Sequence, residues 1–148
     1  MKSNQVKPIP DGYHTVTPYL VIEKAGQVMD FLKKAFGAKE IYRHENPDST
    51  IRHAELQIGD SRIMFSEASG SFKPMPSMLV LYVEDMDTLY KQAIAAGAKS
   101  LREPTNEFYG DRSAGVLDMS GNQWWISTHV EDVSPEEMKK REEAMAKK

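Results

Sequence analysis

The chain repeats itself after about 60 residues, and this duplication restricts the fold more than any other feature of the sequence. Three pairs of segments correspond: Leu20–Glu23 with Leu81–Glu84, Gly37–Lys39 with Gly97–Lys99, and Gly59-Asp60 with Gly121-Asn122. Internal similarity at a fixed spacing indicates repeated structural units. Each half is too short to cover its own sheet, so the two halves must pack on each other or on a second chain.

Each half has the pattern of one strand, one helix and three further strands. Runs of β-branched and aromatic residues predict strands, and apolar residues at helical spacing predict helices. The first half has strands at Tyr13–Ile22, Lys39–His44, Ile51–Ile58 and Arg62–Ser66, and a helix at Ala25–Phe36 that Gly37 ends. The second half has strands at Met78–Val83, Lys99–Arg102, Arg112–Leu117 and Gln123–Thr128, and a helix at Asp87–Ala96. The sequence therefore predicts an α+β fold of paired βαβββ modules.

Composition divides the chain into a lead-in, a domain and a tail. Residues 1–12 are polar and contain two prolines, which predicts a flexible lead-in. We expect a single domain over residues 13–130, with module one at 13–68, a linker at 69–76 and module two at 77–130. Residues 131–148 are mostly charged. A charged C-terminal helix is predicted there by three start signals: Ser134 as N-cap, Pro135 at the first helical position and Glu137 in a capping box.

The last predicted strand has two different faces, because a strand sends alternate side chains to opposite sides. Trp124 and Ile126 fall on one face, and we expect them in the core. Trp125, Ser127 and His129 fall on the other face, where a ligand could bind.

Composition and charge exclude several classes of protein. The chain has no cysteine, which excludes disulfides and thiolate metal sites and makes a cytoplasmic location the simplest expectation. No apolar run reaches the roughly 18 residues that a membrane span needs, and the N-terminus lacks an apolar signal core. The net charge is −3 with both signs interspersed, so no nucleic-acid partner is indicated.

Several motifs lie at fixed places in this pattern: Pro18-Tyr19-Leu20, His53-Ala54-Glu55-Leu56, Phe108-Tyr109-Gly110-Asp111-Arg112, Asp118…Gly121-Asn122…Trp124 and Thr128-His129. Paired βαβββ modules with these motifs resemble the vicinal oxygen chelate superfamily, which includes glyoxalase I, extradiol dioxygenases and bleomycin- and fosfomycin-resistance proteins. Within it the motifs are similar to the PhnB-like branch. The resemblance covers about residues 13–130. It implies a curved, mostly antiparallel cup-shaped sheet, with helices on the convex face and a ligand on the concave face.

Metal-dependent members of that superfamily place His or Glu on the first and the last strand of each module. The resemblance puts these positions at Thr17, Met64, Met78 and Trp125. None of the four side chains offers the imidazole or carboxylate that such a divalent ion needs. We therefore expect the usual metal site to be absent, and we expect no cofactor.

His53 and Glu55 form the first candidate pair, because residues two apart on a strand share a face. The pair could contact a ligand, or it could bind a metal or move a proton. Alternatively it is a hydrogen-bonded pair in a polar wall, with Arg62 as its countercharge.

The loop before the seventh strand holds the second candidates. Arg112 could grip an anionic or carbonyl group with its planar fork while Tyr109 stacks on the ligand. Alternatively, Asp111 and Arg112 form a structural salt bridge or cap.

Four large side chains on the ligand-facing sides of the strands would give an apolar floor for a flat molecule: Met64, Met78, Tyr82 and Trp125. Alternatively, these side chains pack against the other module or another subunit.

These observations favour a metal-free homodimer that binds a small, partly apolar, anionic or oxygen-rich molecule between its modules. The candidate ligand-binding residues are Tyr19, His53, Glu55, Arg62, Met64, Met78, Tyr82, Tyr109, Arg112, Trp125 and Ser127. One alternative is a divergent lyase, isomerase or oxygenase whose catalytic residues are His53, Glu55 and Arg112. Another is a dimeric interaction module with a filled cup.

Overall fold

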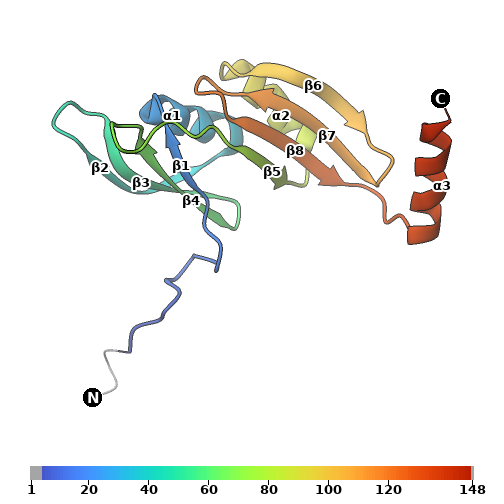
Figure 1. Ribbon diagram of the computed structural model, residues 1–148, viewed down its shortest axis with the longest axis horizontal. Coiled ribbons are helices and arrows are strands. Elements are labelled where there is room, and N and C mark those ends of the chain that lie inside the picture. Colours follow the sequence, from blue (N-terminus) through green and yellow to red (C-terminus); the bar gives the residue numbers. More distant parts are fainter. Residues whose placement is uncertain (1–4, 148) are drawn as a thin grey trace. The chain divides into compact units, whose positions relative to one another are not determined.

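The computed structural model describes residues 5–147. The chain divides into two compact units at the Pro76–Ser77 boundary, and each unit contains one four-stranded sheet (Figure 1). Residues 5–18 form neither helix nor strand, and residues 1–4 of the predicted lead-in lie outside the described part.

The first unit has the order strand, helix and three strands. Its elements are β1 (Tyr19–Ile22), α1 (Ala25–Phe36), β2 (Lys39–Glu45), β3 (Ile51–Ile58) and β4 (Ser61–Glu67). The sheet order is β1-β4-β3-β2, with β1 parallel to β4 and the other pairs antiparallel. Helix α1 packs on β3 and β4.

The second unit repeats this topology. Its elements are β5 (Met78–Tyr82), α2 (Met86–Ala95), β6 (Lys99–Asn106), β7 (Asp111–Leu117), β8 (Gln123–His129) and the additional helix α3 (Pro135–Ala146). The sheet order is β5-β8-β7-β6, again with one parallel pair, β5 and β8. Helix α2 packs on β6, β7 and β8, which leaves the opposite face of the sheet open. The predicted α+β fold of paired βαβββ modules is confirmed.

The helices begin and end where local chemistry sets them. Helix α1 has the predicted bounds, and Gly37 ends it with φ 67°, a left-handed conformation that glycine adopts at little cost. Helix α2 starts before the predicted Asp87, because the Asp85 side chain caps it by accepting the Thr88 backbone N–H. Helix α3 starts as predicted, with the Ser134 hydroxyl accepting the N–H of residue 137.

Strand β3 has its predicted bounds, and β2, β4, β5, β7 and β8 differ from theirs by one residue at one or both ends. Two strands, β1 and β6, differ by several residues. Strand β1 begins at Tyr19 and not at Tyr13, since Pro18 has no N–H to pair; its carbonyl accepts the Met64 N–H. Strand β6 continues past Arg102 to Asn106. It can include Pro104 because β6 is an edge strand, where a missing N–H breaks no ladder.

The core of each unit lies between its helix and its sheet. Trp124 and Ile126 are buried, as predicted. Other side chains on the helix side of the central strands are also buried: Ala54, Leu56, Ile63 and Phe65. The residues that alternate with them along each strand face away from the helices. The predicted division of the last strand into two faces is therefore confirmed. None of the helices among residues 5–147 has the length and apolar character that crossing a membrane requires.

The β7–β8 turn contains a buried polar network that sequence reasoning missed. The Asp118 carboxylate accepts hydrogen bonds from the backbone and side chain of Asn122 and from Trp124 Nε1 at 2.8 Å. All three residues are buried. The network fixes the turn in which Gly121 takes φ 87°.

Candidate functional site

The open face of the second sheet carries an aromatic platform. Val80 of β5, Trp125 of β8, Gly115 of β7 and Arg102 of β6 lie opposite one another across the four strands. The benzene ring of the Trp125 indole lies against Gly115. A Cβ on that glycine would come within 2.7–2.8 Å of three ring carbons. Gly115 is therefore the residue that lets the indole lie on the sheet.

A row of hydroxyl groups lies beside this platform. Tyr82 of β5 is opposite Ser127 of β8, which is opposite Ser113 of β7. Ser127 and Ser113 are only 4% and 5% exposed. Both belong to the open face, because they are two residues from Trp125 and Gly115 on their strands.

Asp111 is the first residue of β7 on the open face, and it connects Tyr82 with His129. Its carboxylate accepts a hydrogen bond from the Tyr82 hydroxyl at 2.6 Å and contacts His129 Nδ1 at 2.8 Å. The other imidazole nitrogen, Nε2, contacts Asp132 at 2.7 Å. The bond to Asp111 raises the pKa of Tyr82, and the bonds to Asp111 and then Asp132 raise the pKa of His129. An imidazole that donates from both nitrogens is the protonated form.

These residues surround a cavity of about 340 Å³, the size of small-molecule sites. Its walls come from all four strands and the loop before β7: Met78, Val80, Tyr82, Arg102, Tyr109, Asp111, Ser113, Trp125 and Ser127. The Arg102 guanidinium lies 2.6 Å from the Glu107 carboxylate. The charged side chains in these walls are therefore paired, and apolar and hydroxyl groups remain for a ligand.

The loop that carries Tyr109 is held in place by its backbone. The Gly110 carbonyl accepts the N–H groups of Val130 and Glu131. Gly110 has φ 101°, and a Cβ there would overlap the Glu131 carbonyl oxygen. Arg141 of α3 also holds this loop, because it donates to the Phe108 carbonyl at 2.8 Å and forms a bidentate pair with Glu131.

Arg112 does not lie on this open face. Its guanidinium forms a bidentate salt bridge with Asp87 of α2, with contacts of 2.9 and 3.0 Å, and donates to Asn106. Strand alternation explains this position, because Ala114 and Val116 on the same side of β7 are buried beneath α2. Of the two alternatives for Arg112, the structural salt bridge is the one formed. Its partner is Asp87 and not the expected Asp111.

The first unit brings His53 and Glu55 together as predicted. His53 Nε2 contacts Glu55 at 2.9 Å, and its Nδ1 contacts the Tyr19 hydroxyl at 3.1 Å. Tyr13 donates to the other Glu55 oxygen. Burial raises the pKa of Glu55, but the bonds from Tyr13 and His53 outweigh it, and the net pKa is lowered.

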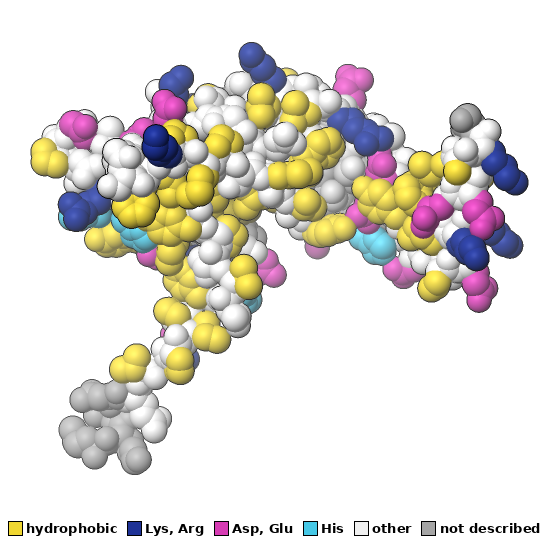
Figure 2. Space-filling view, viewed as in Figure 1, with side chains coloured by type: hydrophobic (Ala, Val, Ile, Leu, Met, Phe, Trp, Pro, Cys, Tyr) yellow, Lys and Arg dark blue, Asp and Glu magenta, His cyan; other side chains and the backbone are white. Residues whose placement is uncertain are grey.

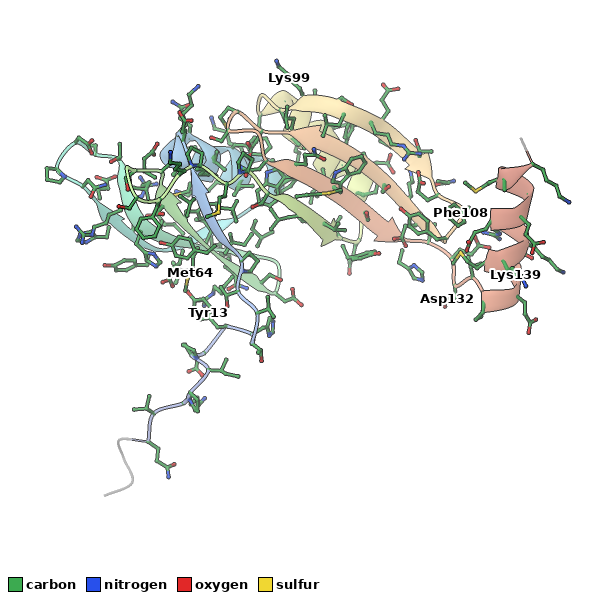
Figure 3. The ribbon with its side chains drawn as sticks, viewed as in Figure 1. Tyr13, Met64, Lys99, Phe108, Asp132 and Lys139 are labelled. Carbon is green, nitrogen blue, oxygen red and sulfur yellow. The ribbon has the colours of Figure 1, made fainter. Side chains whose placement is uncertain are left out.

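Arg62 lies beside this network but does not pair with Glu55 directly. It donates to Gln57, and its guanidinium carbon lies 5.0 Å from the centre of the Tyr13 ring. Burial and then the bond to Glu55 raise the pKa of Tyr13. Met64 lies close to Tyr13 in Figure 3 and lines a cavity of about 490 Å³ with it.

The four positions that the family resemblance assigns to metal ligands fall in two pairs, each within one unit. Thr17 and Met64 line the 490 Å³ cavity, and Met78 and Trp125 line the 340 Å³ cavity. No cluster of three His, Cys, Asp or Glu side chains able to hold a metal ion occurs among residues 5–147.

Sequence reasoning missed Asp111 as a cavity residue, and it missed Ser113 and Gly115. A signal for them existed, since the three occupy alternate positions of one strand. Counting in twos back from the hairpin turn places them on the face opposite Ala114 and Val116.

Two βαβββ units with helices on one sheet face and a lined cavity on the other define a class of small-molecule-binding folds. The chain matches the model of the Glyoxalase/Bleomycin resistance protein/Dioxygenase superfamily over residues 14–126. The protein belongs to this superfamily, whose members bind small molecules.

Relatives and solved structures agree with this assignment. An uncharacterized protein of Mycobacterium tuberculosis (strain ATCC 25618 / H37Rv) is 30% identical over 134 residues, which covers 83% of this chain and 79% of the relative. The crystal structure of TioX from Micromonospora sp. ML1 has a TM-score of 0.68 and 24% identity, and covers 79% of this chain and 99% of its own. A PhnB protein from Bacillus cereus has a TM-score of 0.63 and 18% identity, and covers 78% of this chain and 99% of its own. These structural neighbours share the fold of the chain.

Proposed function

We propose that this protein binds a small, partly apolar organic molecule on the open face of its second sheet, without a resident metal ion. The observation that carries the proposal is the Trp125 platform in the 340 Å³ cavity. Met78, Val80 and Tyr82 next to it are 64%, 58% and 65% exposed, which is unusual for large side chains on one short strand. A flat ligand would cover this apolar surface and gain the free energy of its burial.

The metal-free part of the proposal rests on the chemistry of the side chains. Catalytic divalent ions bind through several imidazole and carboxylate groups, and Thr17, Met64, Met78 and Trp125 provide a hydroxyl, two thioethers and an indole. Metal analysis of the untagged protein tests this part. We expect less than a stoichiometric amount of zinc, nickel, manganese or iron, and a stoichiometric ion would contradict it.

Ligand binding can be measured through Trp125 itself. We expect a hit from a metabolite and antibiotic panel to raise the melting temperature and to change the tryptophan fluorescence. At a ligand concentration 100 times Kd the stabilisation is about 2.7 kcal/mol. Trp125→Phe should remove the fluorescence response and weaken binding, whereas Trp124→Phe should keep both, because Trp124 faces the core. A response that survives in Trp125→Phe and disappears in Trp124→Phe would refute the proposed site.

The alternative enzyme that uses His53, Glu55 and Arg112 is less well supported. His53 and Glu55 form a pair on the open face of the first sheet, but the Arg112 fork is occupied by Asp87 on the helix side of the second. A substrate would have to break a bidentate salt bridge to reach Arg112.

We further propose that the chain acts as a homodimer with residues 13–130 as its binding domain. No described residue of α3 is buried, and charged side chains surround this helix in Figure 2. Its Met145 is half exposed. Sedimentation equilibrium should give twice the chain mass, and a monomer at micromolar concentration would exclude this assembly.

A further inference from the structure

Two serine side chains of the second unit have hydroxyl groups that make no hydrogen bond within residues 5–147. Ser113 and Ser127 lie opposite each other on β7 and β8 and line the 340 Å³ cavity. They are 5% and 4% exposed. Their oxygens are not among the fully buried unpaired atoms, so they can be reached from the cavity, where a hydroxyl can both donate and accept a hydrogen bond. Two such groups in the wall of one cavity therefore offer hydrogen bonds to a ligand that enters it.

The position of the serines relative to Trp125 defines what the ligand must look like. Each serine is two residues from the platform on its own strand, and this spacing is about 7 Å. A ring that stacks on Trp125 therefore reaches the serine pair with a substituent on its edge. Tyr82 is opposite Ser127 and extends the hydroxyl row toward β5.

The charges around the cavity decide which substituent fits. Arg102 is paired with Glu107, and His129 lies between Asp111 and Asp132. The cavity walls thus offer a carboxylate no unpaired cation, and Asp111 would repel it. Serine and tyrosine hydroxyls both donate and accept, so they suit an uncharged hydroxyl or carbonyl oxygen.

We propose that Ser113 and Ser127 form a subsite for a neutral oxygen substituent of a planar aromatic ligand whose ring stacks on Trp125. This proposal rests on the proposed function and narrows it, since the small, partly apolar molecule becomes an uncharged aromatic one that carries an oxygen. It also replaces the anionic ligand that the sequence suggested.

Three matched compounds test the subsite: 2-naphthol, 2-methylnaphthalene and 2-naphthoate. We expect the wild-type protein to bind 2-naphthol most tightly in calorimetric titrations, and 2-naphthoate at least about 10-fold more weakly. Ser113→Ala and Ser127→Ala should each weaken binding of 2-naphthol roughly 3- to 10-fold, the usual effect of one hydrogen bond. Neither change should affect 2-methylnaphthalene. Ser61→Ala, on β4 of the first unit, is the control and should leave all three affinities unchanged.

The melting temperature distinguishes a ligand-binding role of the serines from a structural one. Because the two hydroxyls have no partner, the double variant S113A/S127A should melt no lower than the wild type. A marked loss of stability would assign the serines a structural role and overturn the subsite.

The outcomes distinguish failure of the serine subsite from failure of the proposed ligand-binding site on Trp125. If 2-methylnaphthalene and 2-naphthol bind equally well and both need Trp125, the binding site stands and the serine subsite is refuted. Equal binding of 2-naphthoate also refutes the subsite. If none of the three compounds binds, the aromatic platform is not a ligand site, and both proposals fail.

Discussion

Adjacent tryptophans on β8 should respond very differently to truncation, and this difference tests the assignment of the two sheet faces. Trp124 is 0% exposed in the core beneath α2. Trp125 is only partly buried and lies over Gly115 on the open face. We expect Trp124→Ala to be strongly destabilising and Trp125→Ala to be mild.

The magnitudes follow from what each side chain contacts. Removing a fully buried aromatic side chain costs about 3–5 kcal/mol. Trp124 also donates to the buried Asp118 carboxylate at 2.8 Å, so its loss should fall at the upper end of that range. Trp125 loses part of its apolar contact and its bond to Gln123, and we expect about 1–2 kcal/mol for a side chain that remains partly in water.

Urea unfolding followed by far-ultraviolet circular dichroism measures both variants, because this signal does not depend on tryptophan. We expect the Trp124→Ala midpoint to fall far below that of Trp125→Ala at a similar m-value. Trp124→Phe is a useful intermediate, since it keeps most of the buried area but removes the bond to Asp118. Equal costs, or a larger cost for Trp125→Ala, would refute the facing of the strand and the cavity built upon it.

Three further outcomes follow from the loop and the end of β8. Gly110→Ala should destabilise by at least about 2 kcal/mol, because its φ is positive and a Cβ would overlap nearby backbone, whereas Gly70→Ala should be neutral; equal melting temperatures would contradict this. Asp111 raises the pKa of His129, so the protonated imidazole stabilises the folded protein. This contribution to the free energy of unfolding is complete below about pH 6.5, the pKa of an unperturbed histidine, and is lost as pH rises through the raised pKa. His129→Gln should flatten that decline in urea titrations, and parallel declines would exclude the effect. Arg141→Ala should speed amide exchange in residues 107–111, and unchanged exchange would show that α3 does not hold the loop.

Much of the fold could be predicted because strand and helix periods are local. The bounds of α1 were predicted correctly from apolar spacing and Gly37, and the two faces of β8 from simple alternation. The start of β1 was predicted wrongly, because composition favours strand from Tyr13 while Pro18 cannot donate to the ladder.

The site was harder to predict, because its partners come from distant parts of the chain. Arg112 and Asp87 are 25 residues apart and meet only when α2 covers β7. The sequence analysis paired Asp111 with its neighbour Arg112, but adjacent residues of a strand point to opposite faces. The observed partners of Asp111 are Tyr82 and His129. Reasoning from neighbours in the chain therefore placed Arg112 on the wrong face of β7.

The open face of the second sheet has features that stability alone does not explain. A water-facing sheet surface normally carries polar side chains, but β5 presents Met78 and Tyr82 at 64% and 65% exposure. Next to them, Ser113 and Ser127 line the cavity with hydroxyl groups that have no hydrogen-bond partner in the described chain. Covering the apolar side chains with another apolar surface would leave both hydroxyls unpaired, and water could satisfy the hydroxyls only by leaving the apolar surface wet. An occupant that is flat and apolar on one side and carries an uncharged oxygen satisfies both surfaces at once.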